Sequence, residues 1–102
     1  MKLSIAERLM VAQLLPEKGS FINLGLIRKA KENVSFSDKE YADLHIKITD
    51  EGRVTWVDPG NYNKDIEFGE IVTAMIVKNL KAMDDKEELE EKYFSTFEKF
   101  IK

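Results

Sequence analysis

The sequence predicts a single helix-rich α+β domain with three helices, a β-hairpin and two C-terminal helices. Three observations lead to this prediction. Serine N-cap signals recur in the first half of the chain, apolar spacing becomes alternating between residues 45 and 57, and helical spacing returns from residue 70. A length of 102 residues with 43% apolar residues suits one domain, residues 1–102, with a modest core.

The first helix is expected from Ser4 to Leu15. Ser4 is a favourable N-cap, and Glu7, three residues later, completes a capping box. Apolar residues 5, 9 and 12 share one helical face, which we expect to be buried. Pro16 then ends the helix, because its ring clashes with the preceding turn and it has no N–H to donate.

A second helix is expected from Leu24 to Asn33, with Asn23 as its cap and the apolar pair Phe21–Ile22 returning to the core just before it. The spacing of its apolar residues turns three side chains inward, namely Leu24, Ile27 and Ala30. Ser37 and Glu40 form a second capping box, which predicts a short third helix over Asp38–Leu44.

Alternation of apolar and polar residues predicts a β-hairpin. Its strands are His45–Thr49 and Arg53–Val57, joined by a turn at Asp50–Gly52. The next segment, Asp58–Asn63, is rich in turn-forming residues. Ile66–Phe68 is expected to add a short third strand.

Two helices complete the predicted domain. The first, Glu70–Met83, is apolar on most of its surface and is therefore either central in the fold or covered by a second chain. The last is capped by Asp84 or Asp85, and its expected buried stripe consists of Leu89, Tyr93, Phe94, Phe97, Phe100 and Ile101. Because these helices carry so much apolar surface, a symmetric homodimer is a further expectation.

Three short helices and a hairpin are also the element order of a winged helix, with Asp38–Leu44 in the recognition position and Asp50–Arg53 at the wing tip. Charge argues against DNA binding. The whole chain has a net charge of -3, and the would-be recognition helix carries three acidic residues and one basic residue. A DNA-binding regulator is therefore the alternative function, and it would use the basic residues of the second helix, Arg28, Lys29 and Lys31.

Composition excludes several kinds of chemistry. The chain has no Cys, which excludes a thiol nucleophile and thiolate-bound metals, and its single His excludes a His-rich metal site. It contains no P-loop, nucleophile elbow or dinucleotide-binding pattern. The acidic run Asp84–Glu91 is typical of the first turn of a helix, although whether it binds a cation is left open. We therefore predict no enzymatic activity and no cofactor.

The chain is expected to be cytoplasmic and to make no membrane contact. Runs without a charge, such as Leu9–Pro16 and Ile71–Val77, are far shorter than the roughly 20 apolar residues that span a bilayer. The apolar N-terminal stretch is interrupted by Glu7 and Arg8 and is followed by no cleavage site, so it is not typical of a secretory signal.

Glu7–Leu9, Leu14–Phe21, Val54–Trp56 and the Tyr- and Phe-rich C-terminal segment together resemble small bacteriophage- and prophage-encoded proteins that carry no assigned activity. The resemblance extends over most of the chain, and its motifs are structural: a helix stop, a turn and a hairpin Trp. It implies a bacterial cytoplasm and an accessory role, with no catalytic residue to carry over.

The predicted function is that of a non-enzymatic protein-binding module acting through a host or viral protein. The segment Asp58–Asp65 is long for a connection, and with the hairpin it would form one recognition face. The predicted protein-binding residues are Arg53, Trp56, Asn61 and Tyr62. A Trp in a hairpin is more often a core residue than an interface anchor, and the segment is equally typical of a simple crossover to the next helix, so these alternatives stay open. A third function is an acidic inhibitor that occupies a nucleic-acid-binding site on a target protein.

Overall fold

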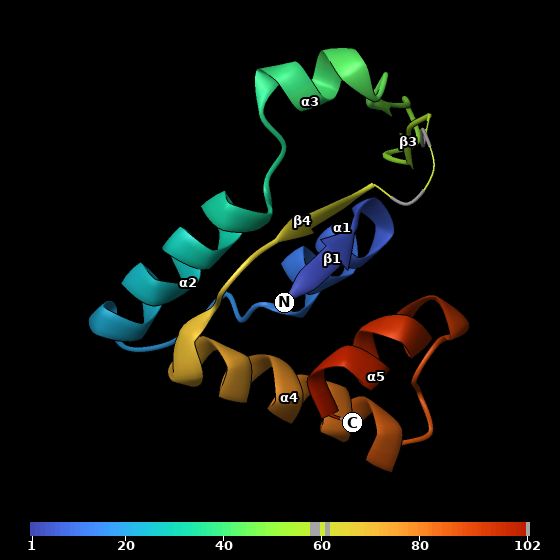
Figure 1. Ribbon diagram of the computed structural model, residues 1–102. Coiled ribbons are helices and arrows are strands. Elements are labelled where there is room, and N and C mark those ends of the chain that lie inside the picture. Colours follow the sequence, from blue (N-terminus) through green and yellow to red (C-terminus); the bar gives the residue numbers. More distant parts are fainter. Residues whose placement is uncertain (58–59, 61, 102) are drawn as a thin grey trace.

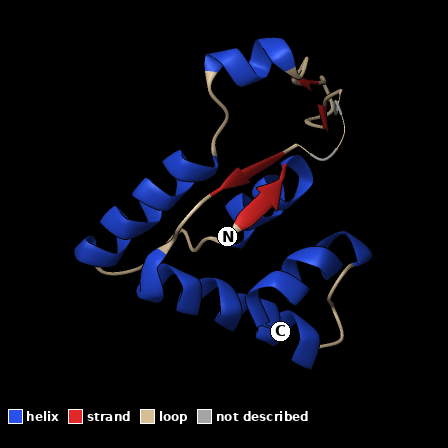
Figure 2. Ribbon diagram, viewed as in Figure 1, coloured by secondary structure: helices blue, strands red, loops and turns tan. Residues whose placement is uncertain are grey.

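The computed structural model describes residues 1–57, 60 and 62–101, and it confirms the helix-rich α+β class. The elements in chain order are β1 (Lys2–Ser4), α1 (Ile5–Leu14), α2 (Phe21–Val34), α3 (Asp38–Asp43), β2 (Lys47–Ile48), β3 (Val54–Thr55), β4 (Asn63–Asp65), α4 (Gly69–Asp85), the 3-10 turn η1 (Glu91–Tyr93) and α5 (Phe94–Ile101). α3 and the hairpin lie at one end, α4 and α5 at the other, and β1 and α1 between them (Figures 1 and 2).

The described residues form two small antiparallel sheets, one of which is a local hairpin and the other of which joins distant parts of the chain. The hairpin is confirmed with shorter strands than expected, and Ile48 of β2 lies opposite Val54 of β3. The strand expected at Ile66–Phe68 instead ends at Asp65, and it pairs with β1, where Lys2 lies opposite Asp65. β1 is too short for an alternating pattern to reveal it. In the part of the chain that the structure describes, the hairpin pairs with no other strand, so the winged-helix likeness stays a prediction.

Two clusters of buried apolar residues meet at α1. The main core comprises Leu3, Val11, Leu14, Leu15, Ile27, Ala30, Val34, Ile66, Val72, Ile76, Leu80 and Tyr93. A smaller core beneath α3 and the hairpin consists of Ile5, Leu44 and Ile46, with half-buried side chains such as Phe36, Trp56 and Tyr62 packed against it. Because α1 contributes to both clusters, most of its surface is turned toward protein rather than toward water.

The start of α2 differs from the expected start. Ser20, not Asn23, is the N-cap, and its hydroxyl oxygen accepts the Asn23 backbone N–H at 3.1 Å. The helix therefore begins at Phe21, and the expectation that Phe21 and Ile22 return to the core is wrong, because they are 81% and 78% exposed. Leu24 is also exposed rather than inward. The two later inward positions are buried as predicted, namely Ile27 and Ala30.

The C-terminal acidic run also lies elsewhere than expected. Asp84 and Asp85 form the end of α4 instead of capping the last helix, because α4 continues to a Schellman-type end at which the Glu88 N–H donates to the Met83 carbonyl at 2.8 Å. α5 begins only at Phe94, after a 3-10 turn. Phe94 is 59% exposed and not part of the buried stripe.

Glu87 occupies the left-handed position of this helix end, with φ 57°. Glycine adopts that conformation without a Cβ clash, so Glu87→Gly is expected to raise the free energy of unfolding by about 1 kcal/mol. Urea denaturation followed by circular dichroism measures the change. Glu88→Gly is the matched control: Glu88 does not have a positive φ, so glycine there is expected to destabilise the protein. An equal effect of both substitutions would contradict the prediction.

Candidate functional site

The predicted protein-binding residues lie in different environments in the structure. Trp56 and Tyr62 are half-buried and pack against the smaller core, as in the core-packing alternative. Arg53 is exposed beside the hairpin turn, where it lines a shallow hollow of about 430 Å³ with Asp50 and Glu51. Asn61 lies outside the described residues. The described members therefore do not form one solvent-facing surface, and their binding role stays a prediction.

A buried ion pair that sequence reasoning missed lies beneath Tyr62. Arg8 is fully buried, and its Nη1 and Nη2 donate to the two carboxylate oxygens of Glu40 at 2.6 and 3.2 Å. Arg8 Nη2 also donates to the Ser35 carbonyl at 2.6 Å, and Nε donates to the Val34 carbonyl at 3.3 Å. The Tyr62 hydroxyl donates to Glu40 Oε2 at 2.8 Å. The pair thus ties α1, the end of α2, α3 and the segment before β4 together.

The electrostatics of the Arg8–Glu40 pair indicate that it stabilises the fold. Hydrogen bonds from Arg8 outweigh the opposing effect of burial and lower the pKa of Glu40 to about 2. Donation to Glu40 raises the pKa of the Tyr62 hydroxyl. The guanidinium group of Arg8 also lies 4.1 Å from the centroid of the Phe36 ring. Since these bonds engage both carboxylate oxygens, we assign the network a role in holding the fold together.

Removing the Tyr62 hydroxyl tests that assignment. Tyr62→Phe is expected to lower the free energy of unfolding by about 1–2 kcal/mol, because the hydrogen bond goes to a charged carboxylate. Chemical denaturation measures the loss. Tyr41→Phe is the matched control, since Tyr41 is 42% exposed, and it is expected to leave the stability unchanged. Equal stability of Tyr62→Phe and the wild type would show that the hydroxyl does not hold the fold.

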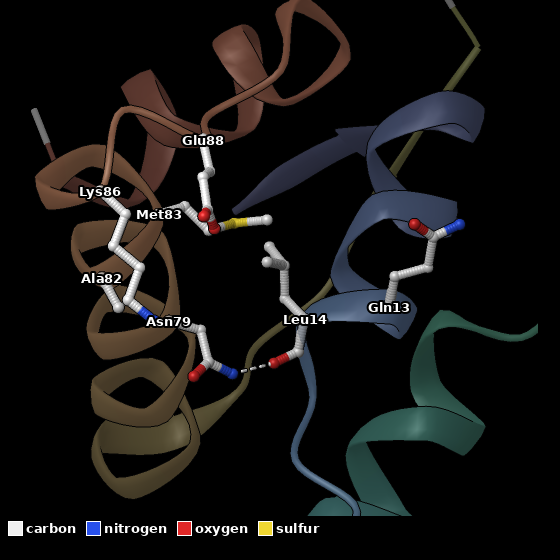
Figure 3. A pocket seen from close by; sticks show the side chains of 7 residues that line it. All are labelled: Gln13, Leu14, Asn79, Ala82, Met83, Lys86 and Glu88. Atoms are coloured by element: carbon white, nitrogen blue, oxygen red, sulfur yellow. Dashed lines mark hydrogen bonds between the residues drawn. The ribbon is translucent and has the colours of Figure 1, made fainter.

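A cleft of about 240 Å³ lies between the end of α1 and the end of α4 (Figure 3). Leu14 and Met83 point toward each other across it, whereas Gln13 points away. Asn79 donates through Nδ2 to the Leu14 carbonyl, and Gln13 Oε1 accepts the Tyr93 hydroxyl at 3.0 Å. Because these amide groups already join neighbouring elements, we interpret the cleft as a helix–helix joint and not as a ligand site.

The acidic run Asp84–Glu91 spans the end of α4, the following turn and the start of η1. Among residues 1–57, 60 and 62–101, no three His, Asp or Glu side chains come together as a metal site would require. His45 is exposed and closes α3 with a φ of 50°. A search of the same residues finds no helix with the length and apolar character needed to cross a bilayer.

An open apolar groove lies where α2 meets the start of α4, which adjoin in Figure 1. Two adjoining hollows of about 280 and 310 Å³ share four lining residues, Leu26, Phe68, Gly69 and Val72. Ile71 lines the second hollow and is 54% exposed. We call this surface, from Leu26 across to Ile71, the α2–α4 groove. Its floor is apolar although it is open to solvent.

Charged side chains of both signs border the α2–α4 groove. Lys29 lies on the α2 side, and Glu67 and Glu70 lie on the α4 side. Ile22 lines neither hollow, but it precedes Leu26 by one helical turn and therefore lies on the same side of α2. Its 78% exposure leaves a large apolar side chain in water. This combination of an apolar floor and a charged rim is typical of protein-binding surfaces.

The basic residues of the DNA-binding alternative do not share one face of α2. Arg28, Lys29 and Lys31 are all exposed. At about 100° per residue, Lys29 and Lys31 point about 160° apart around the helix. Arg28 and Lys31, three positions apart, lie on the same side, so the three residues together form no single basic surface. In the predicted recognition helix, Glu40 is turned into the core by Arg8. The geometry therefore does not favour contacts with a phosphate backbone.

No protein-family model matches this chain, and no curated protein or solved structure is detectably similar to it. The resemblance to phage-encoded proteins therefore stays a prediction. The α2–α4 groove is one apolar surface that packing among the described residues leaves open.

Proposed function

We propose that this protein is a non-enzymatic protein-binding module that holds an amphipathic helix of another protein in the α2–α4 groove. The observation that chiefly supports the proposal is the apolar floor between two helices, where Ile71 lines the groove and is 54% exposed. Inserting an apolar helix face into such a groove is a common mode of peptide recognition. The predicted phage or prophage origin would make the partner a host or viral protein.

The two sides of the groove define the chemistry of the partner. Its floor needs bulky apolar side chains spaced at i, i+3 or i+4 and i+7 along the bound helix. Lys29 on one rim favours a carboxylate on the flank of that helix, and Glu67 and Glu70 on the other rim favour Lys or Arg on the opposite flank. The expected partner is therefore a helix with an apolar face, one acidic flank and one basic flank.

A model peptide tests this function directly. The probe is a fluorescent helical peptide of about 18 residues, or five turns, with Leu on one face, Glu along one flank and Lys along the other. A scrambled peptide of the same composition is the control probe. We expect micromolar binding of the amphipathic peptide in fluorescence anisotropy, no binding of the scrambled peptide, and shifts of backbone amide resonances confined to α2 and the start of α4.

Two isoleucines with similar exposure provide matched variants. Ile71→Ser removes an apolar side chain from the groove and is expected to weaken peptide binding about tenfold, since roughly half of an Ile side chain is left to bury. Ile48→Ser removes an Ile from the hairpin, where it is 67% exposed, and is expected to bind as the wild type does. If the peptide does not bind at millimolar concentration, or if both variants weaken its binding equally, the proposal that the α2–α4 groove binds an amphipathic helix is refuted.

Duplex DNA provides the competing outcome. If the DNA-binding alternative were correct, generic duplex DNA would bind at micromolar concentrations, with an affinity that falls steeply as salt increases. Replacing Arg28 and Lys31 by Gln would abolish that binding, whereas Ile71→Ser would leave it intact. We expect no binding of this kind, because only Arg28 and Lys31 share a side of α2, whereas Lys29 points about 160° away from Lys31.

A further inference from the structure

The outer face of α2, directed away from the core, has an apolar stripe of its own. Phe21, Leu24, Gly25 and Arg28 follow one another at i, i+3, i+4 and i+7 and line a shallow hollow of about 470 Å³. Phe21 is the most exposed large apolar side chain of the described chain, at 81%. We call these four residues the outer α2 stripe. It is separate from the α2–α4 groove, with which it shares no lining residue.

Gly25 lies at the centre of the stripe without a role inside the chain. Glycine weakens the interior of a helix relative to alanine, because the unfolded chain loses more conformational freedom. A Cβ built at Gly25 meets no other atom within 4 Å, so neither packing nor an unusual φ requires glycine there. Its missing side chain leaves a notch that faces solvent between Phe21 and Arg28. Such a notch suits the close approach of a second helix.

We infer that a second copy of this chain covers the outer α2 stripe, with the two α2 helices crossing antiparallel about a two-fold axis at Gly25. In that arrangement the Phe21 ring of each copy reaches the partner's Arg28, an aromatic–guanidinium pair that forms twice. Glu32 lies one turn beyond Arg28 on the same side of the helix. It faces the segment that precedes the partner's α2, where the partner's Lys18 lies exposed.

This self-complementarity favours a second copy over an unrelated protein. The stripe begins with an aromatic ring and ends with Arg28. Lys18, before the stripe, and Glu32, one turn beyond it, are exposed charges of opposite sign. Antiparallel crossing brings unlike ends together, as an isologous interface requires. The outer α2 stripe and the α2–α4 groove have different lining residues, so the inference does not rest on the proposed function.

The oligomeric state of the full chain tests the inference. Analytical ultracentrifugation of the wild type over about 5–500 µM in low salt is expected to show the mass rising from that of the 11.8 kDa chain toward twice that value. A mass that stays at 11.8 kDa throughout this range would overturn the inference. Ile71→Ser, which alters the groove alone, is expected to associate as the wild type does, so failure of the dimer and failure of the groove are distinguishable.

Filling the notch separates association from folding. Gly25→Gln places a long side chain at the crossing point and is expected to weaken the dimer at least about tenfold. The same change favours the helix, so the Tm of the variant at low concentration is expected to equal or exceed that of the wild type. Ala74→Gln, at an exposed position of α4, is the matched control and is expected to dimerise normally. If Gly25→Gln associates as strongly as the wild type, the inference that two α2 helices cross at Gly25 is overturned.

Charge reversal tests the antiparallel direction. Lys18→Glu places like charges opposite each other at both ends of the interface and is expected to weaken association several-fold. Adding Glu32→Lys restores the attraction with the signs exchanged, so the double variant is expected to recover most of the lost affinity. A double variant that associates no better than Lys18→Glu alone would show that these residues do not meet across the two-fold axis.

Discussion

Replacing Arg8 by Met is expected to lower the free energy of unfolding by about 3–5 kcal/mol, the largest effect of any single substitution considered for this protein. Methionine preserves much of the apolar stem of Arg8 but removes all of its hydrogen bonds. The Glu40 carboxylate would then remain in a largely buried site without its cation, and the Val34 and Ser35 carbonyls would each lose a donor. Desolvation of those groups, more than the lost attraction itself, causes the destabilisation.

Urea denaturation of Arg8→Met at neutral pH measures this loss. Arg28→Met is the matched control, because Arg28 is exposed on α2 and makes none of these bonds, and we expect its stability to stay within about 0.5 kcal/mol of the wild type. Two curves with the same midpoint would contradict the assignment of Arg8 as the central tie of the fold. If Arg8→Met does not fold at all, its sensitivity to partial proteolysis can be compared with that of Tyr62→Phe. That substitution removes only one bond of the same network.

The stability of the wild type is expected to decrease by about 3 kcal/mol between about pH 5 and pH 2 through Glu40 alone. The pKa of Glu40 is lowered from 4.5 to about 2 in the folded protein, so the folded state binds a proton less readily than the unfolded state. The resulting stabilisation is complete above the unfolded pKa and is lost as the pH falls through the folded pKa. Protonation of the carboxyl group then weakens its hydrogen bonds to Arg8.

Glu40→Gln isolates this contribution from those of the other acidic groups. The substitution keeps the size of the side chain but removes its charge, so the variant is expected to be less stable at neutral pH and to lose less stability on acidification. Denaturation midpoints measured at intervals from pH 7 to pH 2 provide the comparison. The control, Glu67→Gln, changes an exposed carboxylate and is expected to follow the wild-type curve. Parallel curves for Glu40→Gln and the wild type would refute the assignment.

The features that the sequence predicts correctly depend on residues close together in the chain. The capping boxes at Ser4–Glu7 and Ser37–Glu40 form with both of their hydrogen bonds, because each involves residues only three positions apart. The hairpin is likewise predicted from a local alternation and a turn. The misplaced cap of α2 is also local: Ser20 and Asn23 are both good caps, and the sequence pattern does not rank one above the other.

The features that the sequence does not predict depend on distant partners. The local sequence gives no sign that Arg8 is buried, because its partner Glu40 lies 32 positions later in the chain. Phe21 and Ile22 are apolar, and only the three-dimensional course of α2 shows that nothing in the described chain covers them. The candidate groove follows the same rule, because no local pattern indicates that Leu26 lies beside Phe68. Its rim residue Lys29 was predicted as a possible DNA contact from charge alone.

The pairing of β1 with β4 also determines when the chain can finish folding during its synthesis. Leu3 is fully buried and lies opposite Lys64, so the ribosome has to release residue 64 before β1 finds its neighbour. Until then the nascent chain exposes Leu3 and Ile5, two side chains that are almost completely covered in the finished protein. Closing such a long loop costs chain entropy, so we expect these apolar side chains to be covered late in folding.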